Sequence, residues 1–161
     1  MSTIRYQDPE APPLLNALVG RALGRVRALA AETLGGDLEF AEIELAFEGG
    51  PTLVIGLGAA GREAGGPPEL WVATGSMSHE SDPSNPWQPV ALDAHPVWRP
   101  RLGSRVVAVS AVRGEEPADA GLLTGIVFTF EDGRRVEVYD AGRCLHMVVL
   151  PEDPTPARTR A

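Results

Sequence analysis

The chain contains no lysine: all 14 of its basic residues are arginine, against 22 acidic residues. The absence of lysine excludes Schiff-base chemistry, pyridoxal phosphate attachment and the phosphate-binding lysine of a Walker A loop. The net charge of -8 disfavours nucleic acid and anionic membranes as partners, because both require a basic face. Exclusive use of arginine, with abundant alanine, glycine and proline, suggests a GC-rich bacterial genome.

The sequence also lacks cysteine pairs and long apolar runs. Cys144 is the only cysteine, so no intrachain disulfide can form, which is compatible with a reducing cytosol. The first 13 residues carry no basic segment followed by an apolar one, so no secretory signal is expected. No apolar run approaches the roughly 20 residues of a membrane-spanning helix. We therefore expect a cytoplasmic protein with a single domain over 1–161.

An internal duplication is the main positive signal. Gly20 corresponds to Gly103 and Phe47 to Phe130 at a constant offset of 83 residues, and no gap is needed over 19–59. The apolar alternation matches as well, and a one-residue slip would exchange the two faces of every strand. The predicted parts are repeat 1 over 14–74, a Pro-rich crossover loop over 75–101, repeat 2 over 102–150 and a flexible tail over 151–161.

Repeat 2 is typical of a four-strand antiparallel meander. An Asp-Gly turn at 131–134 separates two alternating apolar runs, which is a strong hairpin signal. In the strand that follows it, Val136 and Val138 point inward, whereas Glu137 and Tyr139 point outward. The strands expected in repeat 2 are 105–112, 125–130, 135–139 and 145–150.

The duplication also corrects the interpretation of repeat 1. By propensity alone, 14–34 looks like one helix. Equivalence to repeat 2 makes its second half a strand, which leaves a short helix over 14–19 between Pro12-Pro13 and Gly20. The strands expected in repeat 1 are 23–30, 41–47, 52–57 and 70–74, and the crossover leaves room for regular structure only around 89–92.

These patterns predict a mainly β fold, with α+β as the alternative. Two related four-strand meanders would pack about a pseudo-two-fold axis, as a sandwich, a continuous curved sheet or a partly closed barrel. Either repeat alone would leave an apolar face exposed. We therefore expect the two repeats to fold as one unit.

Acidic residues form a candidate surface for binding a partner. Glu42, Glu44 and Glu48 fall on the strand face opposite Ile43 and its apolar neighbours. In repeat 2, Glu115, Glu116 and Asp119 occupy the loop between the first two strands. The alternative interpretation is an ordinary solvated face. If the residues act together, they form an electronegative surface that attracts a basic partner.

The crossover holds the remaining candidates. Trp87 and Trp98 either pin it to the sheet or anchor a partner. His79, Asp93 and His95, with Glu80 and Asp82 between them, have the chemistry of zinc or non-haem iron ligands but no recognised spacing. The alternative for these five is a solvated loop.

No catalytic residue and no cofactor is assigned. The sequence contains no G-x-S-x-G elbow. Cys144 and His146 lie on one face of one strand and diverge too far to form a good nucleophile pair.

The repeated unit, G-x-x-V-x-x-V, a loop, then I-x-L-x-F-x-x-G-x-x-L-x-I, resembles small bacterial proteins that include immunity proteins of polymorphic toxin systems. In repeat 2 it is carried by Gly103, Val106, Val109, Ile126, Phe128, Phe130, Gly133, Val136 and Val138. The resemblance implies a non-enzymatic protein that binds and blocks a toxin. The resemblance does not assign an inhibitory role to any residue of this sequence.

The sequence is therefore compatible with three functions. The first is an immunity or inhibitor protein whose acidic surface covers a basic toxin domain, such as a nuclease or deaminase. The second is a small-ligand-binding β domain with its pocket under the Trp87 to Trp98 crossover. The third is a metal-dependent enzyme that uses the crossover histidines. The sequence leaves the oligomeric state open.

Overall fold

The protein consists of ten β-strands, one short α-helix and one 3₁₀ turn within the residues that the structure describes. The computed structural model describes residues 3–5, 11–58, 69–75, 77, 87–114, 122–142 and 144–151. The mainly β fold expected from the sequence is confirmed.

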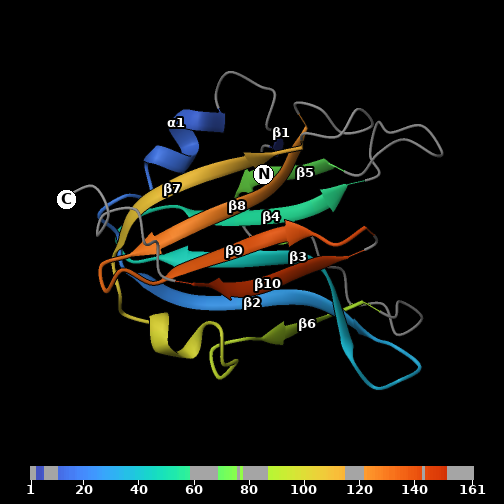
Figure 1. Cartoon of the computed structure of the whole chain (residues 1–161). Helices are drawn as coiled ribbons and strands as arrows, with labels where there is room; N and C mark the ends of the chain where they lie inside the picture. The colour runs from blue at the N-terminus through green and yellow to red at the C-terminus, as the bar shows by residue number, and fades with distance from the viewer. Residues whose placement is uncertain are drawn as a thin grey trace.

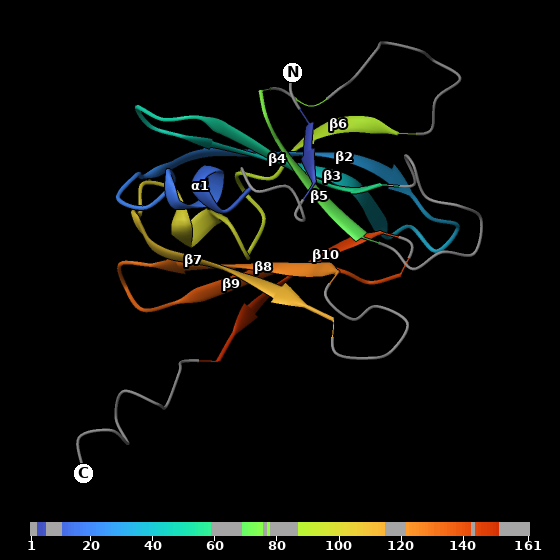
Figure 2. The same cartoon turned by 90° about the horizontal axis from the view of Figure 1, so that it is seen from above.

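The strands form two antiparallel meanders that face each other (Figures 1 and 2). The first meander contains β2 (Leu23–Glu32), β3 (Leu38–Phe47), β4 (Thr52–Gly58) and β5 (Glu69–Thr74). The second contains β7 (Val106–Arg113), β8 (Leu123–Phe130), β9 (Arg135–Asp140) and β10 (Leu145–Leu150). Leu145 of β10 pairs with Phe40 of β3, and this pairing joins the meanders into one sheet curled into a half-barrel.

Two short strands extend the first meander at its edges. β1 (Thr3–Arg5) pairs with β5, and β6 (Gln88–Ala91) pairs with β2. β6 lies in the part of the crossover where the sequence left room for regular structure, and an edge strand tolerates Pro89. β1 was not predicted, because three residues are too few to show an alternation.

The strand registers reproduce the duplication. β2 and β3 pair with irregularities after Leu23 and after Leu29, and β7 and β8 pair with irregularities after Val106 and after Val112. Both pairs of positions differ by 83 residues, the offset found in the sequence. A β-bulge is a specific distortion that bends one strand. Register irregularities that recur at equivalent positions support the proposed correspondence between the halves.

A pseudo-two-fold relation is visible where β2 and β7 begin. Ala22 forms a bridge with Arg105, its own equivalent in the second half. An interface in which a residue meets its counterpart is what a two-fold axis produces. The equivalent hydrogen bonds there run from the Gly20 amide to the Val106 carbonyl and from the Gly103 amide to the Leu23 carbonyl, both at 2.7 Å.

A short helical segment precedes the first strand of each meander. α1 (Ala11–Asn16) begins three residues before the expected start, because Pro12 and Pro13 lack only amides that the first turn leaves unpaired. Its end tightens into turns that lead to Gly20, whose φ of 89° suits glycine. The 3₁₀ turn η1 (Arg99–Arg101) lies in the corresponding place before β7.

One hydrophobic core fills the space between the meanders. It contains equivalent side chains from both halves, such as Phe47 and Phe130. The largest fully buried side chains include Trp98, Phe128 and Phe130. Since each meander supplies the cover for the other, the core is shared between the halves.

Candidate functional site

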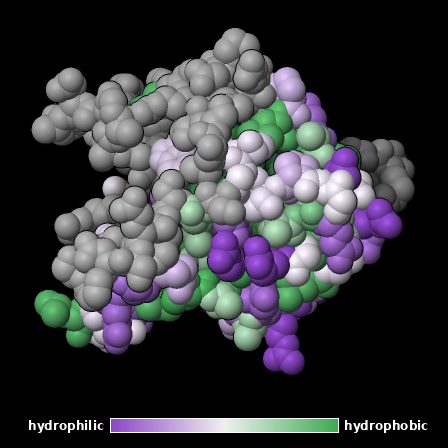
Figure 3. All heavy atoms as spheres, turned by 180° about the vertical axis from the view of Figure 1, so that it is seen from behind, coloured by the Kyte–Doolittle hydropathy of each residue, from purple (hydrophilic) through white to green (hydrophobic). Residues whose placement is uncertain are grey.

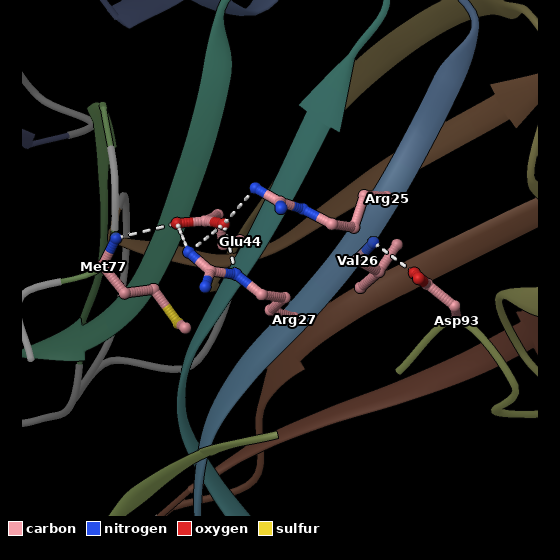
Figure 4. A network of polar contacts seen from close by, with 6 residues as sticks. All are labelled: Arg25, Val26, Arg27, Glu44, Met77 and Asp93. Atoms are coloured by element: carbon pink, nitrogen blue, oxygen red, sulfur yellow. Dashed lines mark hydrogen bonds and ion pairs between the residues drawn. The ribbon is translucent and has the colours of Figure 1, made fainter. Parts of the chain in front are cut away.

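Glu44 is buried, contrary to the expectation that it lines an exposed acidic surface. Only 1% of it is accessible to solvent. Its carboxylate accepts hydrogen bonds from Arg27, from Nε at 2.8 Å and from Nη2 at 3.0 Å, and from the Met77 amide at 2.9 Å (Figure 4). The Nη2 of Arg25 lies 3.6 Å from the same carboxylate. The expectation for Glu44 was wrong because a bidentate arginine satisfies and neutralises it within the fold.

Strand pairing and apolar cover explain this buried pair. Glu44 and Arg27 lie directly opposite each other on β3 and β2, so both project from the outer face of the first meander. Leu29, Val54 and Met77 form a small apolar cluster on the same face. This cluster keeps water from Glu44, whereas 33% of the Arg27 side chain is accessible, and removing Arg27 would leave an uncompensated buried carboxylate.

Trp71 lies across Gly56 on this face. The two residues are paired between β5 and β4, and a Cβ atom at residue 56 would stand 2.1 Å from the indole ring. Glycine therefore provides the space for the ring, which packs against the same apolar cluster. Trp87, half-buried, packs there too. These contacts agree with the interpretation in which Trp87 pins the crossover to the sheet.

Trp98 is part of the core. None of its surface is exposed, and its indole Nε1 donates to the sulfur of Met147 at 2.7 Å. The idea that Trp98 anchors a partner is therefore wrong, because its ring is buried between the two meanders.

The other acidic candidates are dispersed. Glu42 is half-buried and Glu48 is exposed, whereas Glu115, Glu116 and Asp119 lie outside the described residues. Seen from behind, hydrophilic and hydrophobic residues are interspersed where the structure describes the surface (Figure 3). With Glu44 neutralised, the outer face of the first meander is a mixed surface.

Two of the three metal-ligand candidates make local structural contacts. The Oδ1 of Asp93 accepts a hydrogen bond from the Val26 amide at 2.9 Å (Figure 4). The Nδ1 of His95 accepts one from the Val97 amide at 3.1 Å, and burial lowers the pKa of His95. His79 lies outside the described residues, as do Glu80 and Asp82. In the described part of the chain, no three His, Cys, Asp or Glu side chains gather into a potential metal site.

The outer face of the second meander is the more open one. No described element covers it in Figure 2. Ala108, Ser110 and His146 are exposed there, and 38% of Val148 is accessible to solvent. The strand pairings place two rows of side chains side by side on this face: Ser110, Val127, Glu137 and Val148 in one row, and Val112, Gly125, Tyr139 and His146 in the next.

Glu137 lies in the middle of this face. It stands on β9 between Val127 of β8 and Val148 of β10. A Cβ atom at residue 125 would be 2.5 Å from its Oε2, so the carboxylate leans over Gly125 toward β8. Burial raises the pKa of Glu137, because desolvation disfavours its charged form. Among the described residues, no side chain forms an ion pair or hydrogen bond with it.

The charged and polar neighbours of Glu137 are directed elsewhere. Arg135 precedes it on the same face, but its Nη2 donates to the Pro151 carbonyl at 2.8 Å. His146 packs edge-on against Tyr139, with ring centroids 5.7 Å apart. Glu137 is thus a half-buried carboxylate that no described side chain pairs with.

The sequence predicted that Glu137 points outward but did not identify it as a site. The duplication contained the missing signal. At the offset of 83, Glu137 corresponds to Val54, and Ser110 corresponds to Arg27. Comparing polar residues as well as apolar ones between the repeats would have shown that the second repeat has a glutamate at 137 but no arginine at the equivalent of residue 27.

No pocket is found among the described residues. In the same part of the chain, no helix has the length and apolar character needed to cross a membrane. Comparisons with protein-family models, curated proteins and solved structures give no match for this chain.

Proposed function

We propose that the protein is a non-enzymatic binding module that covers a basic partner protein, in the manner of an immunity or inhibitor protein of a bacterial toxin system. The observation that carries this proposal is the net charge of -8 on a small β protein. Such a charge attracts and orients a basic partner and disfavours acidic ones. The proposed site of action is the cytoplasm.

The packing supports a function at the surface. Trp98 and Phe128 are completely buried in the shared core, so the described interior is filled by side chains. The sheet faces remain as the surfaces that a partner can reach. Inhibition would then be steric: the module covers the functional site of the toxin domain and excludes its substrate without turnover.

Affinity capture followed by reconstitution tests this proposal. The tagged chain is expressed in its native host, and proteins that co-purify are identified by mass spectrometry, with a tag-only bait as control. The expected result is one stoichiometric basic protein whose purified form binds one to one in calorimetry. Its affinity should fall about tenfold between about 50 mM and about 500 mM salt, because screening weakens the attraction.

Two results would contradict the proposal. One is that no protein is enriched over the tag-only control in the native host. The other is a partner whose affinity does not change with salt, since charge would then not explain recognition.

A further inference from the structure

The two outer faces carry the same pair of side chains in opposite order. On the first meander, Glu44 of β3 is opposite Val54 of β4. At the equivalent positions of the second meander, Val127 of β8 is opposite Glu137 of β9. The first meander therefore shows how this scaffold accommodates a glutamate beside a valine: an arginine pairs with it.

The second meander lacks that arginine. Ser110 of β7 stands where Arg27 stands on β2. The Glu137 carboxylate leans over Gly125 of β8, and Ser110 of β7 is short and exposed. Between Ser110 and Glu137 only the side chain of Val127 projects from β8. Val127 is itself only 8% accessible to solvent, so a planar guanidinium group can reach Glu137 only from outside, by lying across the surface over Val127.

We propose that the outer face of the second meander is the docking surface for the basic partner, which inserts an arginine side chain above Val127 to pair with Glu137. This inference rests on the proposed function and adds the surface and the recognition chemistry. Tyr139 and the exposed Val148 border the position and supply apolar contact that shields the ion pair from water. Arginine fits better than lysine, because its fork can donate two hydrogen bonds to one carboxylate.

The charge balance favours a foreign partner over a second copy of this chain. Two copies would each bring a net charge of -8 to the interface and repel one another. Within the described residues, the arginine nearest along the strand, Arg135, is directed to Pro151. A basic protein supplies both the attraction and the arginine.

The first experiment uses a defined probe. The labelled protein is titrated with N-acetylarginine amide while its backbone amides are followed by NMR, and N-acetylcitrulline amide serves as the uncharged isostere. The variants are Glu137→Gln and, as a matched control, Glu131→Gln, which removes an exposed charge from the β8–β9 turn. We expect the amides of Gly125, Val127 and Val148 to shift with the arginine probe alone. Glu137→Gln should weaken this binding roughly fivefold, and Glu131→Gln should leave it unchanged.

Equal binding of the probe to Glu137→Gln and to the wild-type protein would overturn the proposed contact. So would shifts located on other surfaces. Arg158 and Arg160 of the chain's own C-terminal segment are an alternative source of the guanidinium. If the probe binds only after Arg158→Gln and Arg160→Gln are introduced together, these residues are the occupant and the partner proposal fails.

The captured partner separates this inference from the proposed function. A partner that binds Glu137→Gln at least about tenfold more weakly, but Glu131→Gln normally, supports the docking surface. Unchanged affinity for Glu137→Gln refutes the surface and leaves the inhibitor function intact. If no basic partner exists, the proposed function fails, and with it the assignment of this surface to a protein.

Discussion

Each half of the molecule carries a glutamate in the middle of its outer face, at positions that are not equivalent, and the two glutamates differ in their surroundings. On the first meander, the carboxylate of Glu44 is sealed beneath Met77 and held by Arg27. On the second, Glu137 stands half-buried beside Gly125 on an open face, without a described partner. The first arrangement links β2 to β3 by hydrogen bonds between side chains. In the second, the hydrogen-bond acceptors of the carboxylate have no partner among the described residues. The difference shows that equivalent meanders in one molecule can differ in how they compensate a carboxylate on the outer face.

The largest expected effect on stability comes from replacing Arg27 of the first meander by serine, the residue at the equivalent position of the second. Arg27→Ser places the residue found at 110 opposite Glu44 and leaves a carboxylate that is 1% exposed without its bidentate partner. We expect the free energy of unfolding to fall by about 3 kcal/mol, as measured by urea denaturation at neutral pH.

Arg25 provides the matched control for Arg27. Its Nη2 is 3.6 Å from Glu44 and its side chain is 53% exposed, so Arg25→Ser should cost less than about 1 kcal/mol. The double variant Arg27→Ser/Glu44→Val installs both residues of the second half and should recover most of the lost stability, since it removes the stranded charge. Equal losses for the two arginine variants would show that the bidentate geometry has no special importance.

Strand identity was predictable because the duplication overrides local propensity. The segment at 23–30 has helical composition, and only its equivalence to 106–113 makes it a strand, as β2 proves to be. The sequence left open whether Trp98 packs on the sheet or anchors a partner, because proline dominates its surroundings, and the structure buries it. Extending the offset backward would have equated Trp98 with Leu15, which is also buried.

Each meander has a glycine on its outer face that lies beneath a larger side chain, and the two glycines should differ in their tolerance of alanine. Gly56 lies under the Trp71 indole, whereas Gly125 lies under the mobile end of the Glu137 side chain. Gly56→Ala forces a packed ring to move and should destabilise the protein by about 1–3 kcal/mol. Gly125→Ala displaces a flexible carboxylate and should cost less than about 1 kcal/mol. Thermal unfolding of the two variants compares them, and a larger loss for Gly125→Ala would contradict the described packing.

A substitution in the second meander can supply the arginine that its outer face lacks. Ser110→Arg places an arginine at the equivalent of position 27, from which it can reach the carboxylate that leans over Gly125. We expect a gain in unfolding free energy of up to about 1 kcal/mol and a lower pKa for Glu137. The added arginine should also block binding of the arginine probe. Ser110→Gln is the neutral control, and identical behaviour of the two variants would show that Glu137 is out of reach.

Alternation of polar and apolar residues along a strand predicts which face of the sheet a side chain lies on, but it does not predict the burial of the candidate-site residues. Alternation placed Glu44 and Glu137 correctly on outward faces, but the period of a strand does not reveal what covers a face. Cover depends on the residue opposite, such as Arg27, and on segments distant in sequence, such as Met77. Which polar side chains pair depends on the register between neighbouring strands. The polar differences between the two repeats carry information about these pairs, whereas the apolar pattern does not.

The smallest expected effect concerns the dependence of stability on pH. Burial raises the pKa of Glu137 in the folded protein above its ordinary value of 4.5. Between these two values the folded state binds more protons than the unfolded state, so the wild-type protein loses stability as pH rises through this window. Glu137→Gln removes that loss and should be slightly more stable at neutral pH, by no more than about 0.5 kcal/mol because solvent screens this half-exposed group.

This gain should disappear below pH 4.5, where the glutamate is protonated in both states. Urea denaturation across this range measures it, with Glu131→Gln as the exposed control. The groups that share the face are Arg135, Tyr139 and His146, so the series is repeated in a His146→Gln background. Parallel pH profiles for Glu137→Gln and the wild-type protein would mean that the carboxylate is already compensated in the free protein. In that case the contrast between the two faces would be one of shape alone, and an incoming arginine would gain nothing there.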